Sequence, residues 1–203
     1  MKHFALFIGR LLYKIVNIKP ICFIPKFWSY IYTGFVTSGI NQIGYNSKVM
    51  SKTRFIGKEY IQILDDVTIG RYGMVSAFKQ EPFTPQIIIS KGAVIGDFCH
   101  ITAINKISIG SNVLLGKFVT VTDNSHGNST EIELSLNPID RMLQSKGPVI
   151  IGNNVWIGDK VTILPNVSIG DSSVIGANSV VVHNIPPFSI AVGNPAKVIK
   201  TIK

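Results

Sequence analysis

The chain has 203 residues, 46% of them apolar and only 15% charged, so it can bury a core and is too apolar for a disordered segment. Its formal net charge is +9, yet the basic residues are spread along the chain, with no run of five or more interleaved with aromatic residues. This pattern argues against a nucleic-acid-binding protein and favours a partner such as an anionic small molecule or an anionic lipid surface.

Residues 1–38 are predicted to form an amphipathic helical segment. Phe4, Phe7, Leu11 and Ile15 fall at helical spacing on one side, and lysines and arginines interrupt the apolar stretch every four to seven residues. No small-residue cleavage site follows, so the pattern indicates neither a signal peptide nor a membrane span. The segment is expected to pack on its own domain or a neighbouring subunit, or else to contact a membrane peripherally.

A six-residue repeat of aliphatic side chains then runs through residues 39–190. Its period matches neither a helix nor a free-standing sheet, but it fits short strands joined by turns, with three strands in each coil of about 18 residues. The sequence therefore predicts a mainly β fold, a left-handed parallel β-helix of about seven coils, in which the Gly or Asn after each aliphatic residue supplies a positive φ. The two unbroken runs are Ile89, Ile95, Ile101, Ile107, Val113, Val119 and Ile151, Ile157, Ile163, Ile169, Ile175, Val181.

The repeat is interrupted between these two runs. The step from Val119 to Ile151 is two positions longer than five hexapeptides, and the intervening stretch is rich in Asn, Ser and Pro. A long loop over about residues 123–148 is therefore predicted, and loops of this length in compact domains usually carry function. Its residues Glu131, Asp140 and Arg141 are candidates to bind a sugar or simply to face solvent. His126 lies at the root of the loop.

Cysteines and histidines are too dispersed to suggest a metal site. Cys22 and Cys99 are far apart in the chain with no CxxC spacing, and no two of the four histidines lie close together in sequence. Neither a zinc cage nor a disulfide framework is expected, which fits a reducing, cytoplasmic location.

Residues from about 40 to 203 resemble the hexapeptide-repeat acyltransferases, in particular the galactoside, maltose and polysaccharide O-acetyltransferases. The resemblance is carried by "TDNSHG" at residues 122–127, "NVWIG" at 154–158 and "GNPAKVIK" at 193–200. It implies a homotrimer that binds acetyl-CoA in a groove between adjacent β-helices. It also implies transfer of acetyl to a sugar hydroxyl, such as one of a surface-polysaccharide precursor. The enzyme is expected to be cytoplasmic, and to work at the inner face of the membrane if residues 1–38 contact lipid.

The resemblance also names the site residues. Such a reaction needs a base with a pKa near 7, because a sugar hydroxyl is barely ionised at neutral pH. His126 matches the family's catalytic histidine. Acceptor contacts are expected from Asp123, Asn124, His100, Asn105 and Trp156. Contacts to acetyl-CoA are expected from Trp156, Gly158, Asp159, Gly176, Ala177, Ser179, Lys197 and Lys200, the last two within a basic tail over 191–203.

Simpler roles remain open for several of these residues. Trp156 could pack between subunits, the Asp and Asn side chains could bond their own turns, and the two lysines could be solvated.

Two other functions also remain open. One is N-acetylation of an amino sugar, although no nucleotide-binding α/β unit precedes the coil, and the other is a non-catalytic trimeric scaffold.

Overall fold

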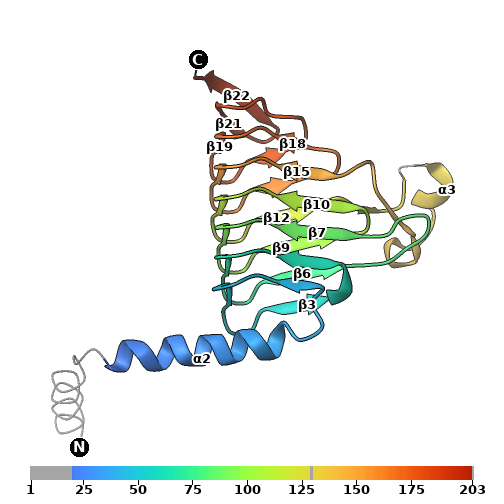
Figure 1. The fold of residues 1–203 in the computed structure, drawn as a ribbon. Helices are drawn as coiled ribbons and strands as arrows, with labels where there is room; N and C mark the ends of the chain where they lie inside the picture. The colour runs from blue at the N-terminus through green and yellow to red at the C-terminus, as the bar shows by residue number, and fades with distance from the viewer. Residues whose placement is uncertain (1–19, 129, 203) are drawn as a thin grey trace, which may run out of the picture.

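The computed structural model describes residues 20–128 and 130–202, and they form a three-sided prism of parallel sheets (Figure 1). Sheet A comprises β1 (Gln42–Ile43), β4 (Ile61–Ile63), β7 (Gln86–Ile89), β10 (Lys106–Ile109), β15 (Val149–Ile151) and β18 (Ser168–Ile169). Sheet B comprises β2 (Lys48–Val49), β5 (Thr68–Ile69), β8 (Val94–Ile95), β11 (Leu114–Leu115), β16 (Trp156–Ile157), β19 (Val174–Ile175), β21 (Ser189–Gly193) and β22 (Ala196–Thr201). Sheet C comprises β3 (Arg54–Ile56), β6 (Met74–Ala77), β9 (His100–Ala103), β12 (Thr120–Thr122), β17 (Thr162–Ile163) and β20 (Val180–Val181).

The three sheets confirm the predicted β-helix. Their arrangement is consistent with the left-handed form, and the strands are parallel except for the final β21–β22 hairpin. All twelve aliphatic positions of the two predicted runs are at most 2% exposed. Each coil alone could not bury its aliphatic residues, so stacking the coils removes this ladder from water and holds the fold together.

The corners of the coils are built differently from the prediction. Asparagines such as Asn154 do adopt positive φ, but so do Tyr72, Phe98 and Phe118, whereas the glycines after the aliphatic residues do not. The expectation that these glycines supply the positive φ is wrong. They are needed for close approach instead, since a Cβ on Gly96 would lie 2.3 Å from the carbonyl oxygen of Gly116 in the next coil.

The strand register locates the extra residues of the irregular coils. Ile163 pairs with Val181, three hexapeptides later, whereas Ile109 pairs with Ile151, seven hexapeptides later. The long loop therefore adds four whole hexapeptides and leaves the phase unchanged. The two-residue shift instead arises at residues 103–106, because Ile101 pairs with Val121, two positions beyond three hexapeptides. The predicted loop is present, but contrary to the prediction it does not cause the change of phase.

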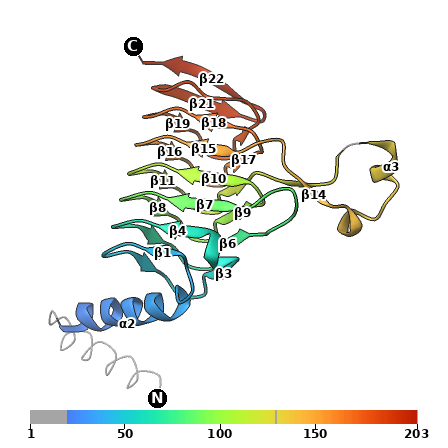
Figure 2. The ribbon, with the colours of Figure 1, turned by 45° about the vertical axis from the view of Figure 1, so that its right-hand side comes forward.

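These extra residues share one corner of the prism, between sheet C and sheet A. Residues 57–60, which include the 3-10 helix η1 (Lys58–Tyr60), residues 78–85 and the long loop all follow a strand of sheet C. Figure 2 shows the last two projecting from the same side of the prism. This corner therefore concentrates the irregular segments beside the outer face of sheet C.

Helix α2 (Pro20–Val36) closes the N-terminal end of the prism (Figure 1). The Thr33 hydroxyl accepts a hydrogen bond from the Val49 amide at 2.9 Å, and Tyr32 and Val36 pack against the core. No helix within the described part of the chain is long and apolar enough to cross a bilayer. The helical pattern predicted from Phe4 to Ile15 lies outside the described residues.

Candidate active site

The long loop is a projecting hairpin that positions His126. Strand β13 (Ser125–His126) pairs antiparallel with β14 (Leu143–Gln144), and His126 lies opposite Leu143. The tip contains α3 (Glu131–Leu134) and η2 (Pro138–Asp140). Arg141 holds the tip together, because its guanidinium donates to the carbonyl oxygens of Leu134 and Leu136 at 2.9 to 3.1 Å. The histidine is thus carried by the paired base of the loop, not by its tip.

A cavity of about 500 Å³ lies between this hairpin base and the outer face of sheet C. Successive coils supply its floor, since His100 pairs with Met74 on one side and with Thr120 on the other. Each of these residues precedes a buried ladder residue, so the alternation of a strand turns it outward. The lining comprises Met74, Phe78, His100, Thr102, Thr120, Thr122, Asn124, Ser125, His126 and Leu143.

Two imidazoles therefore face one cavity. His126 is exposed, so its ring is accessible to a ligand in the cavity. Partial burial lowers the pKa of His100 below its usual value of 6.5, because a desolvated imidazole is harder to protonate. His100 is therefore neutral at physiological pH, and it can donate or accept a hydrogen bond without adding charge.

Asp123 anchors the root of the loop to the coil below. It is fully buried, and its carboxylate accepts hydrogen bonds from the backbone amides of Ile104 and Asn105, each at 2.9 Å. The Asn124 side-chain amide donates a third bond to the same carboxylate at 3.0 Å. A carboxylate enclosed in this way has no surface for a sugar, so we assign it a positioning role three residues before His126.

Asn124 and Asn105 differ in their relation to the cavity. Asn124 lines it while its side-chain amide also donates to the Thr102 carbonyl oxygen at 3.1 Å, so its orientation is set. Asn105 does not line this cavity, and its backbone amide is bound to Asp123. Asn105 therefore acts on the loop that carries His126 through its hydrogen bond to Asp123.

A second loop, over residues 78–85, completes the wall of the cavity. Phe78 lines it directly, and the Gln80 side-chain amide donates to the Leu143 carbonyl oxygen at 2.6 Å, which ties this loop to the hairpin. Neither this loop nor the outward residues Met74, Thr102, Thr120 and Thr122 were predicted from the sequence. The threonines and Met74 could have been found as the residues next to each buried ladder position.

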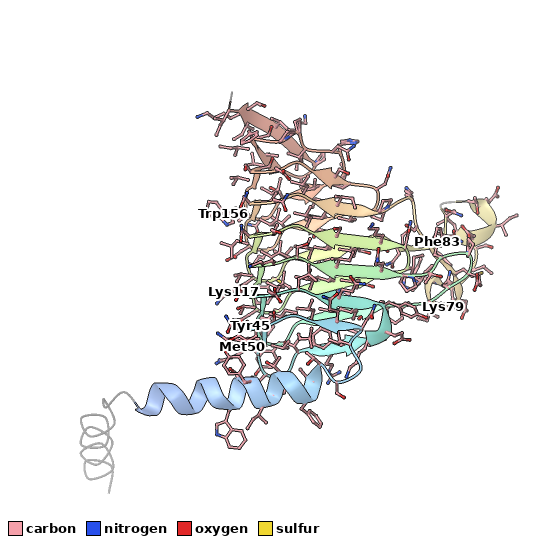
Figure 3. All side chains as sticks on the ribbon, in the orientation of Figure 1. Tyr45, Met50, Lys79, Phe83, Lys117 and Trp156 are labelled. Carbon is pink, nitrogen blue, oxygen red and sulfur yellow. The ribbon has the colours of Figure 1, made fainter. Side chains whose placement is uncertain are left out.

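The residues expected to bind acetyl-CoA lie on another face. Trp156 is 55% exposed on the outer side of sheet B, between Leu114 and Val174, and does not line the His126 cavity. In Figure 3 it lies on the opposite edge of the prism from Lys79 and Phe83, which belong to the loop beside that cavity. Within one chain, Trp156 and His126 are therefore separated by the body of the prism.

The two expected lysines share the outer face of sheet B with Trp156. In β22, Lys200 lies opposite Ile190 and Lys197 opposite Val192, and Ile190 in turn pairs with Val174 next to Trp156. Paired residues point to the same side of a sheet, so both lysines extend the surface that carries the tryptophan.

The remaining expected cofactor residues build the corner after sheet B. The Asp159 carboxylate accepts from the Lys117 amide at 2.8 Å, and the fully buried Ser179 hydroxyl accepts from the Gly193 amide at 3.0 Å. A Cβ on Gly158 would lie 2.6 Å from the Ala177 nitrogen, whereas Ala177 itself is exposed. Gly176 is also tightly packed, since a Cβ on it would lie 2.7 Å from a Val192 methyl. Across residues 20–128 and 130–202, no group of three or more His, Cys, Asp or Glu side chains could hold a metal ion.

Comparison with known proteins identifies the repeats and several relatives. Residues 148–183 match the family described as "Bacterial transferase hexapeptide (six repeats)". A protein of Escherichia coli (strain K12), named as a still unproven O-acetyl transferase of lipopolysaccharide biosynthesis, is 38% identical over 117 residues, which are 56% of this chain and 60% of that protein. The chain thus spans less than two thirds of the length of this relative.

Two solved structures support the same comparison. A galactoside acetyltransferase in complex with coenzyme A has 29% identity and a TM-score of 0.56, covering 84% of this chain and 69% of that one. AntD, an N-acyltransferase from Bacillus cereus in complex with dTDP and 3-hydroxybutyryl-CoA, has a TM-score of 0.67 over 82% of this chain and 85% of its own. Its identity is 21%, so it supports the fold alone.

Proposed function

Because the chain belongs to the hexapeptide-repeat acetyltransferases of the galactoside and maltose O-acetyltransferase-like branch, we propose that it transfers an acetyl group from acetyl-CoA to a sugar hydroxyl. The observation that carries this proposal is the position of His126, which is accessible and faces a cavity of about 500 Å³ floored by threonines. The acceptor is a surface polysaccharide or another glycan, and the relative named for lipopolysaccharide biosynthesis supports that class.

His126 acts as the general base in the proposed mechanism. An imidazole nitrogen accepts the proton of the acceptor hydroxyl as the sugar oxygen attacks the thioester carbonyl carbon. The tetrahedral intermediate then collapses, the carbon–sulfur bond breaks, and the imidazolium returns its proton to the CoA sulfur. The hydroxyls of Thr102, Thr120 and Thr122 orient the sugar, and neutral His100 provides a further hydrogen-bonding group.

The proposed active site forms between two chains. Trp156, Lys197 and Lys200 lie on sheet B, while His126 lies beside sheet C, so one chain does not bring donor and base together. If sheet B of one chain faces sheet C of the next, acetyl-CoA lies in the groove between them with its phosphates near the two lysines. A three-sided prism closes this arrangement as a homotrimer, which light scattering at defined protein concentration would measure.

A peripheral membrane contact completes the proposal. Trp28, Ile31 and Phe35 are exposed on one side of α2, at spacings of three and four residues, and Phe35 is 81% exposed. Such a side fits the interface of a bilayer, where lipid-linked glycans are built. Co-sedimentation with vesicles containing anionic lipid, compared with a Trp28→Ser, Ile31→Ser, Phe35→Ser variant, tests this contact.

The test of the main proposal is acetyl-CoA turnover, followed as thiol release across a panel of sugars and amino sugars. His126→Ala should lower kcat by about 100- to 10,000-fold, the contribution typical of a general base. His183→Ala is the matched control, because His183 is exposed and does not line the cavity. Circular dichroism and calorimetry with CoA establish that both variants fold and bind the donor.

Three outcomes would overturn parts of this proposal. Activity within tenfold of wild type in a folded His126→Ala protein would exclude the general-base role. Turnover with amino sugars alone would indicate an N-acetyltransferase. Absence of CoA binding by the wild-type protein would favour the non-catalytic scaffold.

A further inference from the structure

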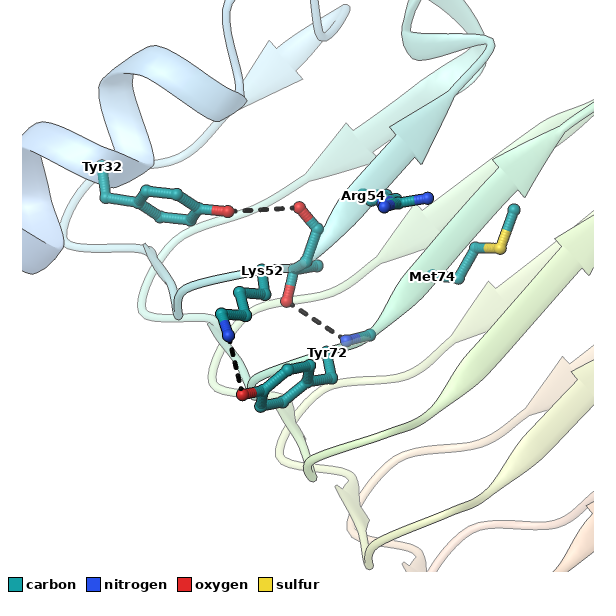
Figure 4. A pocket seen from close by; sticks show the side chains of 7 residues that line it. Tyr32, Lys52, Arg54, Tyr72 and Met74 are labelled. Atoms are coloured by element: carbon teal, nitrogen blue, oxygen red, sulfur yellow. Dashed lines mark hydrogen bonds between the residues drawn. The ribbon is translucent and has the colours of Figure 1, made fainter.

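A second cavity, of about 570 Å³, lies on the same side of the prism, between α2 and the first two strands of sheet C. Figure 4 shows Arg54 and Met74 on these neighbouring strands and Lys52 and Tyr72 at the adjoining corner. Its lining comprises Tyr32, Lys52, Thr53, Arg54, Tyr72, Gly73 and Met74.

This cavity adjoins the one that contains His126. Arg54 pairs with Met74, and Met74 pairs with His100, so these three residues form successive outward rungs of sheet C. Met74 lines both cavities. A single elongated ligand on this face would therefore reach from Arg54 to His126.

The cationic groups of the second cavity are not neutralised by carboxylates. The Lys52 ammonium donates to the Tyr72 hydroxyl at 3.1 Å and lies 4.9 Å from the centroid of that ring. The ion pairs within the described ranges involve Lys91 and Lys117, not Lys52 or Arg54. Arg54 is exposed, and its guanidinium makes no hydrogen bond to another described residue. Two positive charges without a countercharge at one cavity favour an anionic ligand.

The position of Lys52 is restrained by the corner around it. The Tyr72 ring stacks on Phe98, with centroids 4.9 Å apart and planes 3° apart, and Phe98 stacks in turn on Phe118. The Thr53 hydroxyl donates to the Gly70 carbonyl oxygen at 2.6 Å and accepts from the Gly73 amide, which fixes the backbone between Lys52 and Arg54. The two cations thus flank a rigid segment, which lowers the entropy cost of binding a phosphate.

We propose that this cavity binds the phosphate or diphosphate group of a glycosyl phosphate acceptor, whose sugar extends past Met74 to His126. The inference rests on the proposed acetyl transfer for its orientation, but binding of the anion follows from the cavity alone. Arg54 provides a planar fork of donors for phosphate oxygens, and Lys52 adds a point charge.

Two sources of such a diphosphate fit the surroundings. The Tyr72 ring lies between Phe98 and the Lys52 ammonium, so the base of a nucleotide sugar would contact its exposed edge. A neighbouring cavity of about 340 Å³, lined by Trp28, Tyr32, Met50 and Arg71 among others, lies beside α2 and could take the first part of a lipid tail. Both sources present the same chemistry to Lys52 and Arg54, so the experiment includes one of each.

The first experiment measures binding of inorganic pyrophosphate by calorimetry, without a sugar acceptor. Lys52→Met and Arg54→Met keep most of each aliphatic stem and remove the charge, and each is expected to weaken binding about tenfold or more. Lys91→Met is the matched control, because Lys91 lies in neither cavity and its ion pair with Asp66, at 4.0 Å, is a surface contact. Equal affinity in wild type, both variants and control would overturn the proposal.

The second experiment measures acetyl transfer to a neutral sugar, to a nucleotide diphosphate sugar and to a lipid-linked sugar diphosphate in detergent. The variants should raise KM for the diphosphate acceptor that is used and leave KM for the neutral sugar within twofold. Preference for one diphosphate acceptor identifies the source. If no acceptor reacts while pyrophosphate binding depends on Lys52 and Arg54, the proposed acetyl transfer fails and the anion site stands. If acetyl is transferred to the diphosphate acceptors at the same KM in wild type and both variants, the proposed transfer stands and the anion site fails as an acceptor site.

Discussion

Replacing Asp123 with Asn tests how the loop that carries His126 is held. One carboxylate oxygen accepts from Ile104 and from the Asn124 side chain, and the other accepts from Asn105 alone. An asparagine has only one acceptor oxygen, and its amide group would face an N–H donor at the other position. The least costly orientation keeps the bonds from Ile104 and Asn124 and loses the bond from Asn105.

The size of the effect follows from that geometry. A hydrogen bond to a charged group contributes about 1.5 to 3 kcal/mol, and a buried donor left without an acceptor costs about 1 to 3 kcal/mol. The two contributions overlap, and removing a buried charge recovers some desolvation energy. We therefore expect the free energy of local opening at the Asn105 amide to fall by about 2 to 3 kcal/mol. This corresponds to a fall of about 30- to 140-fold in the hydrogen-exchange protection of the Asn105 amide.

Amide exchange by NMR measures this change directly. Asp171→Asn is the control, because the Asp171 carboxylate is exposed and accepts a single bond, from the Asn153 amide. The loss of protection at the Asn153 amide in Asp171→Asn should be smaller, since water can replace that hydrogen bond. The acetyl-transfer rate of Asp123→Asn should also fall about tenfold, as His126 is displaced by its loosened support. Unchanged protection of both Ile104 and Asn105 would refute the assignment of Asp123 as an anchor.

Two further predictions concern coil packing and pH. Gly96→Ala should destabilise the protein by about 3 kcal/mol or more in urea unfolding, because its Cβ would lie 2.3 Å from the Gly116 carbonyl oxygen. Gly34→Ala in α2, where a Cβ would meet nothing within 4 Å, should instead stabilise the protein by about 0.5 to 1 kcal/mol. Similar effects at the two sites would show that close packing does not require Gly96. The folded-state pKa of His100 is lowered, so its stability contribution is present above its usual pKa of 6.5 and is lost as the pH falls from there toward the folded value. Wild type should therefore lose more stability than His100→Gln between pH 7.5 and 5.5, and an NMR titration midpoint for His100 at or above 6.5 would refute this.

The repeat and the loop could both be predicted from the amino acids, though for different reasons. Ile151, Ile157 and Ile163 are required at a spacing of six because each side of every coil must bury one aliphatic residue. The interruption around His126 was visible as a change of composition. The loop does not cause the change of phase, because the two-residue shift belongs to residues 103–106. Ala103 and Ile104 are also buried there, which hides the step in the sequence.

The candidate site was harder to predict because its parts come from separate coils. His126, Asn124 and His100 were proposed from the sequence, and the structure brings them to one cavity. Met74 reaches the same cavity from another coil, which only the strand register decides. Likewise, nothing local distinguishes a carboxylate that contacts a ligand from one, such as Asp123, that is enclosed by backbone amides.

The sequence by itself determined the coil, because the hydrophobic effect acts on every sixth side chain and leaves a periodic record of burial. It also indicated the loop and its histidine. Only the tertiary structure decided which loops share a corner, which face carries Trp156 and which carries His126, and that Lys52 and Arg54 line one cavity beside that of His126. These relations depend on how many residues each coil contains, and insertions alter that number without changing the pattern of any single hexapeptide.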